Sequence, residues 1–146
     1  MKKYILVILS FICLIGYSQK KTEVFPVFDE CKEVESAQLK DCFYATLEQF
    51  VYDNFVLPED VKEKKYTGEV IALFEVDTLG KFKVIYIDAI TEELKKETEN
   101  VFEKLPKIQP ATHSGKATYS KFTLKIAIPL QNPALKQQED FVIKEN

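Results

Sequence analysis

The chain has 146 residues and a formal net charge of −3, and its 46% hydrophobic and 29% charged residues are typical of a globular protein. All 20 of its strongly basic side chains are lysines, and they are interleaved with Asp and Glu along the sequence. Phosphate recognition favours a clustered basic face with arginine side chains, so we do not expect nucleic acid as a partner.

The first 18 residues have the pattern of a secretory signal peptide. Lys2 and Lys3 precede an apolar stretch over residues 4–17 that only Ser10 interrupts, and the small residue Ser18 follows. The export machinery recognises a positive head, a short apolar core and a small residue before the cleavage site, whereas a bilayer span needs about 20 residues. We therefore expect cleavage after Ser18, which leaves 128 of the 146 residues.

Two alternatives to cleavage stay open. An uncleaved signal would act as an inner-membrane anchor, because Lys20 and Lys21 would give a longer helix a polar stop. Acylation at Cys13 would instead produce a lipoprotein. The residue before it is Ile12, however, where a lipoprotein peptidase prefers a small side chain.

Cys31 and Cys42 remain once the signal is removed. An exported protein folds in an oxidising compartment, which favours a disulfide, and closing a loop of about a dozen residues stabilises a fold by about 3 kcal/mol in the chain-entropy model. A metal site or a redox pair would need closer spacing, and the only histidine, His113, is distant in sequence. We expect a structural disulfide between the N-terminal segment and the first helix, with no metal and no cofactor.

The first predicted helix spans about residues 41–55. Asp41 is its expected N-cap and Pro58 its expected terminator. An extended apolar patch over residues 24–28 precedes the helix and is expected to pack against the domain. The charged residues 58–66 follow the helix and are predicted to be a connector. The apolar residues of the helix share one face at a spacing of three and four: Phe43, Leu47, Phe50, Val51 and Phe55.

A β-hairpin is predicted next. Residues 67–76 carry apolar side chains on both faces, which indicates a central strand. Residues 77–80 form the expected turn, because Asp77 can bond its own downstream amides and Gly80 tolerates a positive φ. Residues 82–89 are the antiparallel partner strand. Strict alternation places Val84 and Tyr86 on one face of it and Ile85 and Ile87 on the other.

A second helix and a third strand complete the predicted domain. Thr91 is the expected N-cap of a helix that ends before Pro106 and covers the sheet with a stripe of Leu94, Val101, Phe102 and Leu105. Residues 117–129 then alternate between apolar and polar side chains, which predicts a strand with one wet face. We therefore predict an α+β domain over residues 19–130, with a three-stranded antiparallel sheet (hairpin plus C-terminal strand) packed against two helices, and a polar tail over residues 131–146.

A set of short motifs follows one another across residues 24–130. In chain order they are Phe25-Pro26-Val27-Phe28 with Cys31 and Cys42-Phe43; Asn54-Phe55-Val56-Leu57-Pro58; Gly68-Glu69-Val70; Phe74-Glu75-Val76-Asp77 with Gly80; Leu105-Pro106 with Pro110 and Gly115; and Ile128-Pro129. Together they resemble the C-terminal domain of TonB, the periplasmic energy transducer of bacterial outer-membrane import. The resemblance implies a TonB C-terminal-like fold and a periplasmic location.

The chain also departs from the pattern of that family. Leu57 stands where the family usually has an aromatic residue, and Ala111 stands where it usually has glycine. An energy transducer also carries a membrane anchor and a long proline-rich spacer, whereas only a few residues join the signal to this domain. A cleaved chain is therefore not expected to transmit force from the inner membrane by itself.

The resemblance implies that the domain binds an extended segment of an outer-membrane receptor by adding it as a strand beside the last strand of the sheet. Lys121 and Lys125 would either discourage promiscuous pairing at this edge or select an acidic partner segment. The other candidate contact residues of this edge are Thr118, Ser120, Phe122, Leu124, Ile126 and Ile128.

Two other classes of function are alternatives to strand addition. A structural cell-envelope protein would use the same sheet for self-association as a homodimer or for contact with peptidoglycan. An enzyme is not expected, because His113 and Ser114 have no third group to orient them. Glu92 and Glu93 have a simpler role at the start of a helix, where their charge favours the helix dipole.

Overall fold

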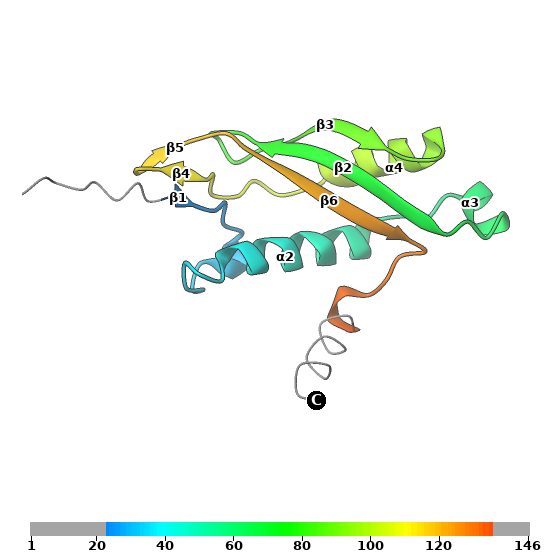
Figure 1. The fold of residues 1–146 in the computed structure, drawn as a ribbon, viewed down its shortest axis with the longest axis horizontal. Coiled ribbons are helices and arrows are strands. Elements are labelled where there is room, and N and C mark those ends of the chain that lie inside the picture. Colours follow the sequence, from blue (N-terminus) through cyan, green and yellow to red (C-terminus); the bar gives the residue numbers. More distant parts are fainter. Residues whose placement is uncertain (1–22, 136–146) are drawn as a thin grey trace, which may run out of the picture.

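The computed structural model describes residues 23–135 as an α+β fold built on one long three-stranded sheet (Figure 1). The predicted signal peptide and the tail beyond Leu135 lie outside the described residues. The elements are β1 (Glu23–Val24), η1 (Asp29–Cys31), α2 (Leu39–Asn54), α3 (Glu59–Glu63), β2 (Gly68–Val76), β3 (Phe82–Asp88), α4 (Glu92–Glu103), β4 (Thr112–His113), β5 (Lys116–Ala117) and β6 (Ser120–Ile128).

The main sheet has the strand order β3-β2-β6, and both pairings are antiparallel. The α+β class, the hairpin and the central position of the second strand are therefore confirmed. The β2–β6 register runs without interruption from the pair Gly68 and Ile128 to the pair Val76 and Ser120. A second, smaller sheet of two-residue strands, in the order β1-β4-β5, was not predicted.

Both long helices cover the same face of the main sheet. The ring of Phe43 on α2 lies 5.0 Å from that of Phe122, and the ring of Phe102 on α4 lies 5.0 Å from that of Phe74. Phe74 and Phe122 are cross-strand partners and therefore point to the same face. The core thus lies between one face of the sheet and two helices, as predicted, and in the described residues no helix covers the opposite face.

A β-bulge changes the predicted facing of β3. Leu73 pairs with Tyr86 but its neighbour Phe74 pairs with Val84, so Ile85 is an extra residue in β3. The side chains of Val84 and Ile87 therefore share the core face, whereas strict alternation would separate them. The predicted grouping of Val84 with Tyr86 is wrong for this reason, and the Tyr86 side chain is 62% exposed.

The β2–β3 turn forms as predicted. Gly80 has a φ of 77°, and the Asp77 carboxylate accepts hydrogen bonds from the amides of Leu79 (2.8 Å) and Lys81 (2.9 Å). The bond from the Lys81 amide is the main reason that the pKa of Asp77 is lowered. The turn also docks onto the segment before β4, because the amide of Ile108 donates to the carbonyl of Gly80 at 3.1 Å.

We expect Gly80→Ala to lower the free energy of unfolding by about 1–3 kcal/mol more than Gly115→Ala does. Both glycines have nearly the same positive φ, 77° and 78°, so the backbone strain is shared. A Cβ at Gly80 would collide with the backbone carbonyl of Ile108, whereas one at Gly115 meets nothing within 4 Å. Urea denaturation of both variants measures the difference, and equal losses would contradict the packing of the turn.

The helix boundaries correct two predictions. α2 begins at Leu39 with Gln38 as its N-cap, so Asp41 lies inside the first turn and is not the cap. The segment after Pro58 is not only a connector, because it contains the short helix α3. The predicted cap of α4 is confirmed, since the Thr91 hydroxyl accepts from the amide of Leu94 at 3.2 Å.

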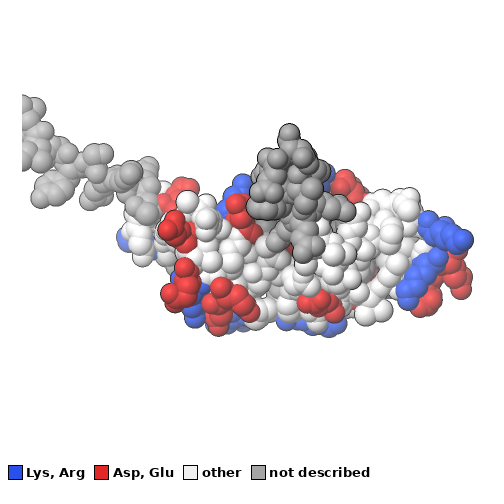
Figure 2. Space-filling view, turned by 90° about the horizontal axis from the view of Figure 1, so that it is seen from below, with Lys and Arg blue, Asp and Glu red and all other residues white. Residues whose placement is uncertain are grey.

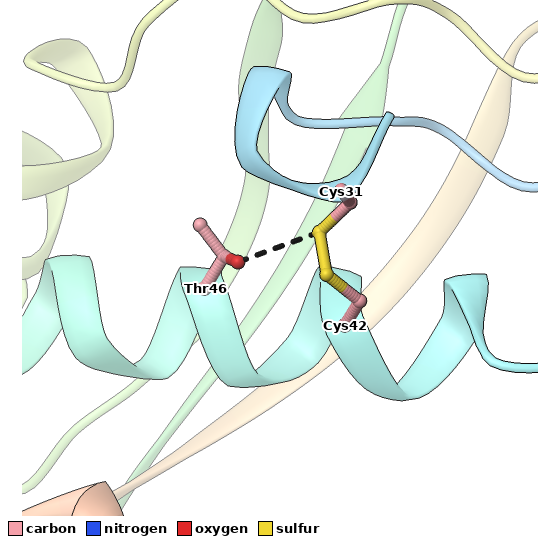
Figure 3. Close-up of a disulfide and its surroundings, with 3 residues drawn as sticks. All are labelled: Cys31, Cys42 and Thr46. Carbon is pink, nitrogen blue, oxygen red and sulfur yellow. Dashed lines mark hydrogen bonds between the residues drawn. A yellow bond between two sulfur atoms is a disulfide. The ribbon is translucent and has the colours of Figure 1, made fainter. Parts of the chain in front are cut away.

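The predicted disulfide joins Cys31 and Cys42, with their Cα atoms 6.0 Å apart (Figure 3). It ties the 3-10 helix η1 to the second turn of α2. Cys31 is fully buried, and its sulfur lies 3.6 Å from the Thr46 hydroxyl. The bond therefore secures the N-terminal segment against the helix that covers the last strand, which is a structural role.

Candidate binding edge of the sheet

β6 forms one edge of the main sheet. Within the described residues it pairs with β2 alone, so its other side has no strand neighbour. Its side chains alternate along the strand between buried and solvent-facing positions. Phe122, Leu124, Ile126 and Ile128 are buried, whereas Lys121, Thr123 and Lys125 are exposed. The alternation and the wet face are as predicted.

The strand starts later than expected. β6 begins at Ser120, whereas Thr118 lies before it and donates its amide to the carbonyl of Ala111 at 2.9 Å. The predicted strand over residues 117–129 is therefore shorter, and Thr118 does not belong to the edge. Lys116 and Ala117 belong instead to β5 in the small sheet.

The turn fixes which backbone groups of β6 face the open edge. The Asp77 amide donates to the Lys81 carbonyl at 2.9 Å, so Asp77 directs its backbone groups toward β3. Bonding direction alternates along an antiparallel strand, so the even-numbered residues of β2 direct theirs toward β6. These residues pair with even-numbered residues of β6. The backbone groups that face outward therefore belong to Lys121, Thr123, Lys125 and Ala127.

The two edge strands of the main sheet, β6 and β3, differ in how well they can pair with a further strand. β6 is a regular strand of nine residues with no register shift. β3 has seven residues and carries the bulge at Ile85, and a bulge twists an edge away from further pairing. A hollow of about 510 Å³ is lined by residues of β3 and α4, Lys95 and Glu99 among them. β6 is thus the edge on which an extended guest can form a continuous ladder.

Two hollows accompany β6, one near each end. The larger, of about 490 Å³, lies beside Ser120 and Phe122 and is also lined by Phe25; we call it the Phe25 hollow. The smaller, of about 70 Å³, lies between Leu124 and Ile126 of the strand and Tyr52 of α2; we call it the Tyr52 hollow. Both lie on the helix side of the strand.

The exposed side chains of β6 lie on the outer face of the main sheet, which is the face opposite α2 and α4. Ion pairs on this face distinguish the two lysines of β6. Lys125 Nζ lies 3.4 Å from the Glu69 carboxylate. The residue paired with Lys121 is Glu75, but the carboxylate of Glu75 is 3.9 Å from the ammonium of Lys83 on the other side. Among residues 23–135, Lys121 makes no ion pair. The strand edge thus carries one compensated and one uncompensated positive charge.

Charged side chains of both signs occur on the face of the molecule that Figure 2 shows. Figure 2 shows the face seen from below in Figure 1, where lysines and acidic side chains are interspersed with uncharged residues. This is the pattern of a solvated surface rather than of a phosphate-binding face.

The remaining predicted candidates lie outside β6, although His113 lines the Phe25 hollow together with Ser120 and Phe122. His113 Nδ1 lies 3.3 Å from the Glu23 carboxylate, across the β1–β4 pair. Ser114 has a φ of 51° in the tight turn that joins β4 to β5. Across the described part of the chain, no three metal-ligating side chains come together and no helix is long and apolar enough to cross a membrane.

Sequence reasoning missed the residues that border the Phe25 hollow. Phe25 packs 5.1 Å from Phe122 and 5.2 Å from Phe43, and the pairing of β1 with β4 brings Glu23 and His113, which are distant in sequence, to the lining of the same hollow. Only the apolar patch over residues 24–28 gave a local signal. Comparisons with protein-family models, with curated proteins and with solved structures found no match to this chain.

Proposed function

We propose that this protein is a periplasmic binding module of the TonB C-terminal type. In this proposal it recognises an extended segment of a partner protein, an outer-membrane receptor in TonB-linked transport, by adding that segment as a strand to the β6 edge. The sequence motifs support the family and the export signal supports the location.

The observation that carries the proposal is the regular edge of β6. Four residues direct their amides and carbonyls outward along it, and a guest strand would satisfy them with main-chain hydrogen bonds. An edge of this length with a buried apolar face is a liability unless a partner or a protective device covers it. Lys121 and Lys125 would limit pairing with arbitrary strands, whereas a matched segment would satisfy the outward backbone groups.

The surroundings of the edge supply selectivity. Alternate side chains of an added strand point to opposite faces, so one set would meet the Phe25 and Tyr52 hollows and the other set would meet the exposed lysines. Apolar residues therefore suit the inward positions of the guest, because Phe122, Leu124 and Tyr52 line the hollows.

Titration of the mature chain, residues 19–146 after the expected cleavage, with peptides from periplasm-facing receptor segments tests the proposal. We expect the largest amide shifts at Lys121, Thr123, Lys125 and Ala127, because their N–H groups would gain acceptors. Amides at Phe122, Leu124 and Ile126 should shift less, since they already bond to β2. Shifts confined to β3 and α4, or no shifts at all, would contradict strand addition at β6.

A structural envelope protein is the second candidate. Tyr86, which pairs with Leu73 on the sheet face that the two long helices leave uncovered, is 62% exposed, and Ile85 at the bulge is 43% exposed. Neighbouring exposed apolar side chains favour self-association. Sedimentation equilibrium and a peptidoglycan pull-down separate this role from receptor binding: a stable dimer or cell-wall retention without peptide binding would favour the scaffold.

A further inference from the structure

We infer that the β6 edge selects acidic guest segments and that Lys121 is the residue that sets this preference. The inference rests on the proposed strand addition and names the chemistry of its partner. It follows from the distribution of charge on the outer face of the sheet, where each strand contributes ionisable side chains.

The carboxylate nearest to Lys121 in the register is engaged elsewhere. Glu75 is the cross-strand partner of Lys121, yet its Oε1 atom lies 3.9 Å from Lys83 Nζ and its side chain is only 18% exposed. Glu75 lies opposite both Lys83 and Lys121 in the register, but of these two lysines only Lys83 forms an ion pair with its carboxylate. Lys121 is left as an exposed ammonium without an ion-pair partner within the described chain.

Lys125 has a different environment. Its ammonium lies 3.4 Å from the Glu69 carboxylate, and both side chains are on the outer face. A guest carboxylate beside Lys125 would also lie near Glu69, so attraction and repulsion would largely cancel. The two lysines are four residues apart on one strand, but only Lys121 offers uncompensated charge.

An added strand brings its own side chains within reach of Lys121. Directly opposite residues of neighbouring strands have Cβ atoms about 4.5–5.5 Å apart, and opposite charges in this arrangement stabilise the pair. A carboxylate at that position of the guest would pair with Lys121, whereas a lysine there would be repelled. An acidic guest is therefore favoured and a basic one is disfavoured, while main-chain bonding is common to both.

Isosteric peptides separate the charge effect from strand addition. The probes are a ten-residue peptide that alternates valine with glutamate and its counterpart that alternates valine with glutamine. Valine suits the hollows, so the glutamate or glutamine side chains would face outward in either strand direction. We expect the glutamate peptide to bind the mature chain about two- to five-fold tighter, which is the range of exposed ion pairs.

Two protein variants locate the preference. Lys121→Gln should bring the two peptide affinities together. The double variant Glu69→Gln/Lys125→Gln removes a compensated pair without changing the net charge, so it should keep the wild-type preference. A preference that survives Lys121→Gln, or equal affinities of both peptides for the wild-type chain, would overturn the inference.

The same titrations report separately on the proposed function. If both peptides perturb the amides of Lys121, Thr123 and Lys125 equally, strand addition stands and the acidic preference fails. If neither peptide perturbs them, strand addition itself fails and the inference falls with it. Raising the salt concentration should reduce the preference, because exposed charges are screened, and should leave binding of the glutamine peptide unchanged.

Discussion

Thr123→Pro is expected to weaken binding of the valine–glutamate peptide at least ten-fold while the domain stays folded. The amide of Thr123 faces the open edge, so proline there removes no hydrogen bond of the β2–β6 ladder. It does remove a donor that the guest needs, and the ring obstructs the approach of a second backbone. Loss of one buried hydrogen bond together with a steric clash accounts for at least about 1.4 kcal/mol.

Thr123→Ala is the matched control, because it changes the same side chain and keeps the donor. It should bind the guest with nearly wild-type affinity in isothermal titration calorimetry. Near-UV circular dichroism reports whether each variant is folded. Undiminished binding to Thr123→Pro would exclude pairing at this amide, and unfolding of that variant would show that the amide belongs to the internal ladder.

Phe43→Ala is expected to lower the free energy of unfolding by about 3–5 kcal/mol, the range for removal of a buried phenylalanine. Phe43 is fully buried on α2. Its ring lies 5.0 Å from that of Phe122, 5.2 Å from that of Phe25 and 5.4 Å from that of Phe28. The side chain therefore joins the N-terminal segment, the helix and the edge strand, and no neighbour can fill the space without leaving its own contacts.

Phe50→Ala is the comparison for this substitution. Phe50 lies on the same helix and is only partly buried, so the change in helix propensity is the same but less packing is lost. Urea denaturation should show a clearly smaller loss for Phe50→Ala than for Phe43→Ala. Equal losses would contradict the central place of Phe43 in the core.

The elements with strong local patterns were predictable from the sequence. The alternation from Phe122 to Ile128 identified the last strand, and the pair Asp77 and Gly80 identified the turn. Thr91 was recognised as a cap because its hydroxyl precedes two acidic residues and an apolar stripe. In each of these cases the physical cause lies within a few neighbouring residues, so the sequence alone contains the information.

The features that the sequence did not reveal depend on contacts between distant segments. The bulge at Ile85 cannot be detected in the sequence, because apolar residues fall at plausible core positions whether or not β3 contains an extra residue. The small sheet joins Val24 to Thr112, and two-residue strands have no periodicity to detect. The outward set of amides on β6 followed only from the hydrogen bond of Asp77 together with the register of all three strands.

The predicted candidate residues mixed two roles that the structure separates. Phe122, Leu124 and Ile126 place their side chains in the core and, by the alternation of the ladder, bond to β2. Lys121 and Lys125 lie between them and direct their backbone groups outward. A list of edge residues could be drawn from the sequence, but their division into core-facing and guest-facing sets required the register.

Residue-resolved hydrogen exchange of residues 19–146 without any guest tests the open edge most directly. The predicted result is alternation along β6: slow exchange at Phe122, Leu124 and Ile126, and fast exchange at Lys121, Thr123 and Lys125. Because this protein sample includes residues 136–146, the experiment also reports whether another part of the protein covers the strand. Protection of both sets would show that the edge is already paired and would contradict strand addition by a partner.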